Sequence, residues 1–463
     1  MESRLQTRSP IDGSVYVERP LAGGADIQAA LERADTARAG WRHTPLAERV
    51  RIARAAITAF AGRGERIAEE LTWMMGRPIR YTPGEVRGFV ERASYMADIA
   101  EEALADLRLP DKPGFTRFIR REPLGLVFVI APWNYPYLTA VNAVVPALLA
   151  GNTVLLKHSA QTPLCAERMV EAFRDAGLPE GVFQYLHLSH ADTERVIQAR
   201  EVKHVAFTGS VSGGAMVERA AAGRFISSGL ELGGKDPAYV RADADLAHAV
   251  DTAIDGAFFN SGQSCCGIER IYVAEQVHDE FVERAIALVR QYQLGRPDDP
   301  ETTLGPLVRT EAAEFVRGQI DEAVAQGATA HIDAAGFPAD QRGTPYLAPQ
   351  LLTGVHHRMR VMTEESFGPV VGVQKVSGDD EAVALMNDSD YGLTAAIFSR
   401  DPAAALALGD RLDTGTVFLN RCDYLDPALA WTGVKDSGRG CTLSRVGYEH
   451  LTRPKSFHFK TTL

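Results

Sequence analysis

A chain of 463 residues is too long to fold around one compact core, so two or three domains are expected. Its apolar fraction of 45% and charged fraction of 24% are typical of a globular protein and exclude a disordered chain. The net charge of −11 is spread along the chain and argues against a nucleic-acid partner, which would need a basic face.

The sequence carries no sign of secretion or membrane insertion. The start, MESRLQTRSPIDG, lacks the basic and apolar pattern of a signal peptide, and the longest apolar run, near residues 140–150, suits a core helix. The five cysteines are an odd number without the spacing of a disulfide framework. We therefore expect a cytoplasmic protein with reduced thiols and no membrane partner.

Helices are predicted for the first hundred residues, because apolar residues recur at helical spacing in Ala-rich segments. These segments are 27–39, 46–61 and 84–107. After residue 120 the pattern changes, and short β-rich runs alternate with helical segments. The runs are 125–132, 152–159 and 204–210. Such alternation predicts βαβ units and a doubly wound parallel sheet.

A second series of the same kind follows, with β-rich runs at 268–274, 368–376, 393–399 and 415–419. The expected fold class is therefore α/β with two doubly wound domains, which meet near Gly233. The last residues, PKSFHFKTTL, alternate like an exposed strand. A terminal strand of this type often pairs with a partner subunit.

Motifs for nucleotide binding are weak when each is taken alone. The GxGxxG fingerprint is absent, and GLELGGKD approaches a P-loop but places Asp236 where Ser or Thr must hold magnesium. No GxSxG elbow of a serine hydrolase is present. In FTGSVSGG, Gly209 and Ser210 lead from a strand into a helix, whose free N–H groups could bind phosphate. Turn geometry and helix capping explain the same residues.

Two polar residues follow β-rich runs. Asn134, in APWNYP, stands where a parallel sheet places its site and could donate a hydrogen bond to an oxyanion, although a turn explains it equally. Glu231 lies in the apolar run LELGG. A carboxylate in such a place is either paired structurally or has a raised pKa suited to a general base, and the residues alone leave both readings open.

Cys265 and Cys266 stand side by side in GQSCCG. A disulfide between adjacent residues would be strained, and a metal site would need more ligands than this segment offers, so no metal is expected. A nucleophile needs help to form a thiolate, since the ordinary cysteine pKa of about 8.5 leaves little at neutral pH. The flanking glycines permit an exposed turn, and no apolar run precedes the pair. These features favour a nucleophile over a packing residue.

Taken together and in this order, the motifs resemble the aldehyde dehydrogenase superfamily over essentially the whole chain. The similarity rests on PWNYP, LLKHS, FTGS, LELGGK, GQSC and EESFGPV, which lie in one order and at the family's spacing. By this resemblance the nucleophile is the second residue after the glutamine of GQxC, which is Cys265. Cys266 is then an inert neighbour.

The resemblance also implies a reaction. Cys265 attacks an aldehyde, Asn134 and the Cys265 backbone N–H hold the oxyanion, hydride passes to NAD or NADP, and Glu231 activates the water that hydrolyses the thioester to a carboxylic acid. The presence of Glu231 favours hydrolysis over transfer to coenzyme A. The cofactor contacts implied are Trp133, Lys157, Gly209, Ser210, Glu365 and Phe367. Without the resemblance, an ion pair and a core aromatic would explain Glu365 and Phe367.

Three segments depart from the family pattern. Lys157 is followed by His-Ser-Ala, so Ala160 replaces the acid that repels a 2′-phosphate in many NAD-preferring relatives, and NADP is admitted. Residues 184–190 replace a Gly-rich turn beside the adenosine pocket. Residues 421–434 replace the usual substrate-anchoring segment, and neither Asp423 nor Arg421 there identifies the substrate.

The expected organisation follows from the same resemblance. Residues 1–106 and 125–233 form an NAD(P)-binding domain and residues 234–448 a catalytic domain. Residues 107–124 and 449–463 form a small β oligomerisation flap that makes homodimers or homotetramers. The alternatives are a thioester or ester hydrolase that uses the same Cys265, and a non-catalytic nucleotide-binding scaffold.

Overall fold

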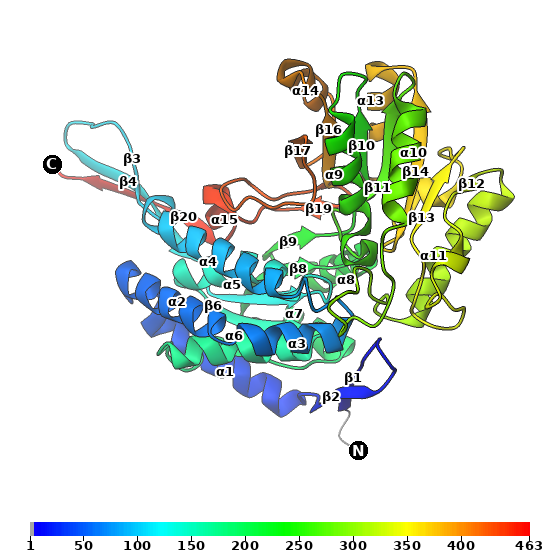
Figure 1. Ribbon diagram of the computed structural model, residues 1–463. Coiled ribbons are helices and arrows are strands. Elements are labelled where there is room, and N and C mark those ends of the chain that lie inside the picture. The colour runs from blue at the N-terminus through cyan, green and yellow to red at the C-terminus, as the bar shows by residue number, and fades with distance from the viewer. Residues whose placement is uncertain (1–3) are drawn as a thin grey trace.

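The computed structural model describes residues 4–463, which form two α/β bodies and a small separate sheet (Figure 1). The first body is built on a six-stranded sheet of order β19-β9-β8-β5-β6-β7, parallel except for β19. Its strands are β5 (Leu126–Ala131), β6 (Thr153–His158), β7 (Phe183–Tyr185), β8 (Val202–Thr208), β9 (Ser227–Glu231) and β19 (Gly438–Arg439). Every residue of β5 and β6 is buried, as expected for a parallel sheet covered on both faces.

Helices cover both faces of this first sheet (Figure 1). The long helix α4 packs against α2 and α5, and α5 packs in turn against β5 and β6. The helices are α1 (Gly24–Trp41), α2 (Leu46–Ala61), α3 (Gly64–Met75), α4 (Pro83–Ala103), α5 (Pro136–Leu149), α6 (Pro163–Asp175), α7 (His190–Gln198) and α8 (Val211–Ala221).

The second body is built on a seven-stranded sheet of order β12-β13-β14-β11-β10-β16-β17, in which only β12 runs antiparallel to its neighbour. Its strands are β10 (Asp236–Val240), β11 (Ile268–Ala274), β12 (Thr329–Ala330), β13 (Gln350–Thr353), β14 (Val370–Val376), β16 (Thr394–Phe398) and β17 (Thr416–Leu419). Its helices are α9 (Leu246–Phe258), α10 (His278–Val289), α11 (Thr310–Ala325), α12 (Arg360–Thr363), α13 (Asp379–Asn387) and α14 (Pro402–Gly409). The α/β fold class with two mainly parallel sheets is thus confirmed.

A three-stranded antiparallel sheet stands away from both bodies and carries the C-terminus (Figure 1). It contains β3 (Leu107–Arg108), β4 (Phe115–Pro123) and β20 (Thr452–Lys460). The terminal segment is a strand, as predicted, and it pairs along its full length with β4 of the same chain. Before it, α15 (Ser444–His450) packs on α4. A separate two-stranded sheet is formed by β15 (Tyr391–Gly392) and β18 (Val434–Lys435).

The prediction that the first hundred residues are helical is wrong at the N-terminus. There β1 (Arg4–Arg8) and β2 (Val15–Pro20) form an antiparallel hairpin. These strands are short and mostly polar, so the apolar periodicity that indicates a strand is weak in them. The structure also contains α3 between the predicted segments, with Ile67, Leu71 and Met75 on its buried side.

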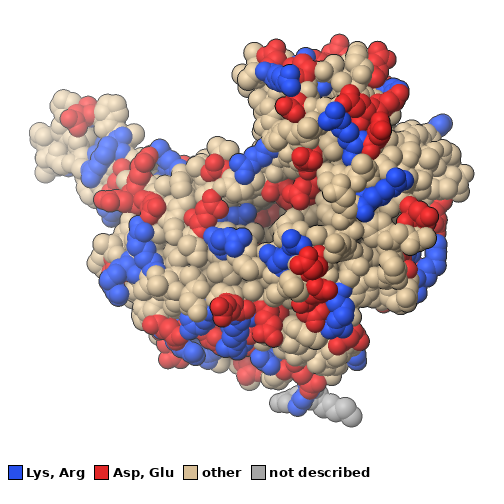
Figure 2. Space-filling model, viewed as in Figure 1, with Lys and Arg blue, Asp and Glu red and all other residues tan. Residues whose placement is uncertain are grey.

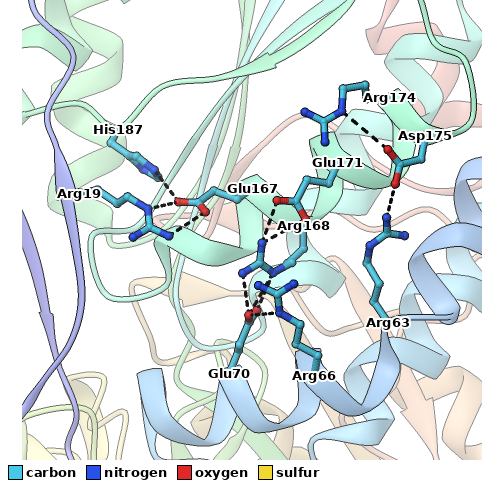
Figure 3. A network of polar contacts seen from close by, with 10 residues as sticks. All are labelled: Arg19, Arg63, Arg66, Glu70, Glu167, Arg168, Glu171, Arg174, Asp175 and His187. Atoms are coloured by element: carbon cyan, nitrogen blue, oxygen red, sulfur yellow. Dashed lines mark hydrogen bonds and ion pairs between the residues drawn. The ribbon is translucent and has the colours of Figure 1, made fainter.

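A network of buried ion pairs ties β2 and α3 to α6 (Figure 3). An Arg168 guanidinium nitrogen lies 2.7 Å from a Glu70 carboxylate oxygen, with both side chains almost fully buried. The preceding residue of α6, Glu167, accepts hydrogen bonds from Arg19 at 2.7 Å and from His187 at 3.1 Å. Burial alone would raise the pKa of Glu167, but these two partners hold it at about 2. The network fixes the helix layer beneath the first sheet.

Candidate active site

The turn that carries Cys265 follows α9 through a short 3-10 helix, Phe259–Gly262. Asn260 and Ser261 both have a φ of 55°, and Gly262 has a φ of 72°. A Cβ atom on Gly262 would lie 2.2 Å from the carbonyl oxygen of Gly368, so only glycine fits there. The backbone therefore reverses within three residues, and Cys265 is left half-buried on the wall of a cavity.

Asn134 joins the end of β5 to this turn. Its side-chain Nδ2 donates to the carbonyl oxygen of Gln263 at 3.2 Å, and its own carbonyl oxygen accepts a hydrogen bond from the Arg77 guanidinium. The Gln263 side chain is held in turn, because its Oε1 accepts from the backbone N–H of Val308 at 2.8 Å. The side-chain amide of Asn134 is thus oriented by its hydrogen bond to Gln263, which lies two residues before Cys265.

Glu231 ends β9 and faces the same cavity as Cys265. One carboxylate oxygen accepts from the Thr442 hydroxyl at 2.5 Å and the other from the Thr208 hydroxyl at 2.9 Å. Burial raises the pKa of Glu231 above its ordinary value, and the two hydroxyl groups oppose that rise. Both contacts come from hydroxyl groups, which agrees with the second of the two interpretations that the sequence left open, a raised pKa.

The cavity has a volume of about 650 Å³ and lies between the two bodies. Helices α4, α5 and α9 and the segment 422–431 line it together with Cys265 and Glu231. Figure 2 shows the surface hollowed between the upper and lower bodies, with Asp and Glu side chains on the upper wall. Residues 4–463 contain no group of three or more His, Cys, Asp or Glu side chains that could hold a metal ion.

Cys266 differs from its neighbour because it is buried. Its Sγ donates to Oδ1 of Asp423 at 2.9 Å, and the Ser264 hydroxyl donates to the same oxygen at 3.2 Å. Interaction with Cys265, burial and the Asp423 carboxylate all raise the pKa of the Cys266 thiol, which keeps it protonated. Asp423, whose pKa is raised to about 6 by burial, therefore holds the cysteine turn.

Trp133 and Phe367 meet across the two bodies. Their ring centroids are 5.7 Å apart with an edge-to-face angle of 78°. Phe367 has a φ of 51°, and the buried Glu269 stabilises this conformation by accepting from the backbone N–H groups of Ser366 and Phe367 at 2.8 and 2.9 Å. Sequence reasoning missed Glu269, although a carboxylate inside the strand IERIYVA was a visible signal.

The remaining residues proposed for the cofactor occupy separate positions. Ser210 caps α8 and accepts from the backbone N–H of Gly213 at 3.2 Å, so the capping explanation accounts for its hydroxyl. Gly209, just before it, has space only for hydrogen beside the Phe207 ring. Glu365 accepts from the backbone N–H of Gly234 at 3.1 Å, and burial raises the pKa of Glu365 to about 8.

Lys157, the penultimate residue of β6, is buried, and no hydrogen-bond or ion-pair partner for it exists among residues 4–463. Burial lowers its pKa. The histidine that follows is structural, because His158 is buried between the carbonyl oxygen of Pro136 and the Thr162 hydroxyl, both at 3.1 Å. An orphaned buried cation at the end of a parallel strand fits a ligand that brings oxygen atoms, such as a nucleotide.

Sequence reasoning also missed a buried ion pair beneath Asn134. Nη1 of Arg77 lies 2.6 Å from Oε2 of Glu85. The other carboxylate oxygen of Glu85 accepts hydrogen bonds from the backbone N–H groups of Tyr137 and Leu138, in the first turn of α5. This carboxylate therefore caps the helix that begins just after Asn134. Nothing in the local pattern around residue 85 indicates the contact, which spans about fifty positions of sequence.

Comparison with known proteins gives one consistent result. The family model described as the aldehyde dehydrogenase family matches residues 1–457. A succinate-semialdehyde dehydrogenase (NADP+) of Deinococcus radiodurans is 37% identical over 98% of this chain and 94% of that protein. A succinate-semialdehyde dehydrogenase (NAD(P)+) of Escherichia coli is 34% identical over 95% of this chain and 94% of that protein.

The solved structures agree. Succinic semialdehyde dehydrogenase from Streptococcus pyogenes in complex with NADP+ superimposes with a TM-score of 0.94 at 29% identity, over 98% of this chain and all of that one. Nothing in these comparisons favours a hydrolase or a non-catalytic scaffold. The chain belongs to the aldehyde dehydrogenase family and is an NAD(P)-dependent oxidoreductase that oxidises an aldehyde to a carboxylic acid.

Proposed function

We propose that Cys265 is the nucleophile of this oxidation and that Asn134 stabilises the oxyanion. The observation that carries the proposal is that Cys265 and Glu231 line one cavity, while Asn134 is hydrogen-bonded to the cysteine's own turn. Attack of the Cys265 sulfur on the carbonyl carbon gives a thiohemiacetal whose oxygen lies near two donors, the Asn134 amide and the Cys265 backbone N–H. Hydride loss then leaves a thioester on Cys265.

Glu231 is proposed as the base of the second half-reaction. It would take a proton from the water that attacks the thioester, which releases the carboxylic acid and restores the Cys265 thiol. A buried carboxylate with a raised pKa is a better proton acceptor than an exposed one. The hydroxyl groups of Thr208 and Thr442 support the carboxylate without supplying a positive charge that would quench it.

For the cofactor, NAD(P) supplies the hydride acceptor when it is bound. We propose that Lys157 and Glu365 bind ribose hydroxyls and that Gly209 and Ser210 approach the pyrophosphate. Phe367 would support the nicotinamide ring, and Trp133 would line the cofactor site beside Asn134. The partnerless amine of Lys157 fits this assignment. Because no acid stands at Ala160 to repel a 2′-phosphate, the site admits NADP as well as NAD.

The organisation of the chain remains our proposal as well. Residues 1–106 and 125–233 would bind NAD(P), residues 234–448 would carry the chemistry, and residues 107–124 and 449–463 would join subunits into dimers or tetramers. The free outer edge of β20 and the half-exposed Phe459 on it support a subunit contact. We also propose the cytoplasm as its location, since the nucleophile must stay reduced.

The test is the appearance of reduced cofactor with purified protein, an aldehyde panel, and NAD or NADP in parallel. Succinate semialdehyde belongs in the panel because two relatives are named for it. Cys265→Ala should abolish cofactor reduction, whereas Cys266→Ala should retain most of it. Equal activity of wild type and Cys265→Ala would refute the assignment of the nucleophile.

A further inference from the structure

Arg92 is an unusual member of the cavity wall. It lies on α4, is only 8% exposed, and lines the same cavity as Cys265 and Glu231. A guanidinium is rarely buried unless a carboxylate pairs with it. In the described part of the chain, however, no carboxylate oxygen lies within 4.0 Å of an Arg92 nitrogen.

The contacts of Arg92 satisfy only one end of its guanidinium. Nη1 donates to the carbonyl oxygen of Leu138 at 2.7 Å and to Oδ1 of Asn142 at 3.3 Å. No acceptor from residues 4–463 meets Nε or Nη2. Burial accordingly lowers the pKa of Arg92, and the carboxylates within electrostatic range only partly oppose that effect. The N–H groups of Nε and Nη2 are therefore available to a ligand in the cavity.

The neighbouring buried carboxylates are engaged elsewhere. Glu85 pairs with Arg77 and caps α5, while both oxygens of Glu231 accept threonine hydroxyls. Neither carboxylate lies within 4.0 Å of an Arg92 nitrogen. None of the nearby acids is therefore within hydrogen-bonding distance of the Arg92 guanidinium.

A second unsatisfied donor lies beside Arg92. Asn142, on α5, is 2% exposed and also lines the cavity. Its Oδ1 accepts from Arg92, which fixes the amide so that Nδ2 is the free group. That Nδ2 is buried and has no partner. A buried donor without an acceptor is costly, and a guanidinium and an amide side by side match the oxygen atoms of a carboxylate.

The other charges of the cavity belong to its exposed rim. Glu91, Asp251 and Asp255 are exposed acids that line it, and Arg87 is an exposed base. Charges in contact with water are screened and weaken quickly with distance. Asp423 is occupied by Cys266 and Ser264. The interior of the cavity therefore offers a cation and an amide donor, whereas the rim offers mainly anions.

We propose that Arg92 and Asn142 form a carboxylate-binding subsite, so that the preferred substrate is a short aldehyde with a carboxylate at its far end. The substrate carboxylate accepts hydrogen bonds from the free donors of Arg92 and from Nδ2 of Asn142, while its carbonyl carbon faces Cys265. This subsite rests on the proposed oxidation by Cys265. It assigns specificity to residues that take no part in the chemical steps.

The test compares two aldehydes of equal carbon number, succinate semialdehyde and butanal, with wild type and Arg92→Gln. Wild type should have the higher kcat/KM for the semialdehyde. Arg92→Gln should reduce that preference roughly 10- to 100-fold, the value of hydrogen bonds between charged groups, and should change butanal oxidation far less. Asn142→Ala should reduce the preference in the same direction, and Arg87→Gln on the same helix should leave it within about twofold.

Inhibition by succinate supplies a readout independent of semialdehyde turnover. Succinate should compete with butanal in wild type, and its inhibition constant should rise in Arg92→Gln. A loss of both substrates in proportion would show that Arg92 only supports α5, and would overturn the subsite. Oxidation of butanal by wild type without preference for the semialdehyde would overturn it too. Failure to oxidise any aldehyde would instead refute the proposed function.

Discussion

Removal of the Thr442 hydroxyl should move the pH dependence of thioester hydrolysis to higher pH. Thr442 donates the shorter of the two hydrogen bonds to Glu231, at 2.5 Å, and Thr208 donates the other at 2.9 Å. Thr442→Val removes only the donor and keeps the shape of the side chain. The carboxylate then loses one partner that stabilises its charged form, while burial continues to favour the protonated form.

The size of the effect follows from the strength of that bond. A hydrogen bond to a charged group is worth about 1.5–3 kcal/mol, and about 1.36 kcal/mol corresponds to one pKa unit. The pKa of Glu231 in Thr442→Val should therefore exceed its wild-type value by roughly one to two units. Glu231 acts as a base, so hydrolysis requires its carboxylate form and the acid limb of the rate profile shifts upward.

The assay follows decay of the thioester after a rapid first turnover, over a range of pH. At neutral pH the variant should hydrolyse the thioester more slowly, and at high pH it should approach wild type. Thr442→Ser keeps the hydroxyl and serves as the matched control. An acid limb at the same pH in wild type and Thr442→Val would refute the role assigned to Glu231.

Four further outcomes are expected. Glu70→Leu should lower the free energy of unfolding by about 3 kcal/mol in urea titrations, because it leaves Arg168 without its main buried partner. Gly262→Ala should reduce both melting temperature and kcat, since its Cβ cannot fit at a φ of 72°. The pKa of Glu167 is about 2 in the folded state, below its unfolded value of about 4.3. The stabilisation of the fold by the Glu167 carboxylate is therefore complete above about pH 4.3 and is lost as the pH falls toward 2. The difference in unfolding free energy between wild type and Glu167→Gln should thus shrink as the pH falls from about 4 to 2. Ala160→Glu should raise KM for NADP more than for NAD, and equal changes would contradict the cofactor assignment.

Much of the architecture could be predicted because it is written in local patterns. The apolar run before Asn134 is a strand that is buried on both faces, and the run that ends at Glu231 is a strand whose start is exposed. Such runs are visible in a local window of the chain. The turn at Cys265 was also indicated by its glycines. The polar hairpin formed by β1 and β2 was missed, because its strands are too short and polar for a clear alternation.

The contacts that adjust the site could not be predicted in the same way. Asp423 meets Cys266 across 157 positions of sequence, and Thr442 meets Glu231 across 211. Arg92 sits in a helix with other charged residues, and its amphipathic pattern gives no reason to bury it. Burial of a charge without a carboxylate partner depends on how two helices pack, which no local window of sequence contains.

The return of the chain to the first sheet has a consequence for biosynthesis. Strand β19 pairs with β9 opposite Leu230 and Glu231, and Leu451 accepts a hydrogen bond from Asn152 across 299 positions. The edge of the first sheet therefore stays open while the ribosome is still translating the second body. Residues 438–451 complete this edge of the sheet. A nascent chain that lacks them already contains the Cys265 turn but has no Thr442 hydroxyl to donate to Glu231.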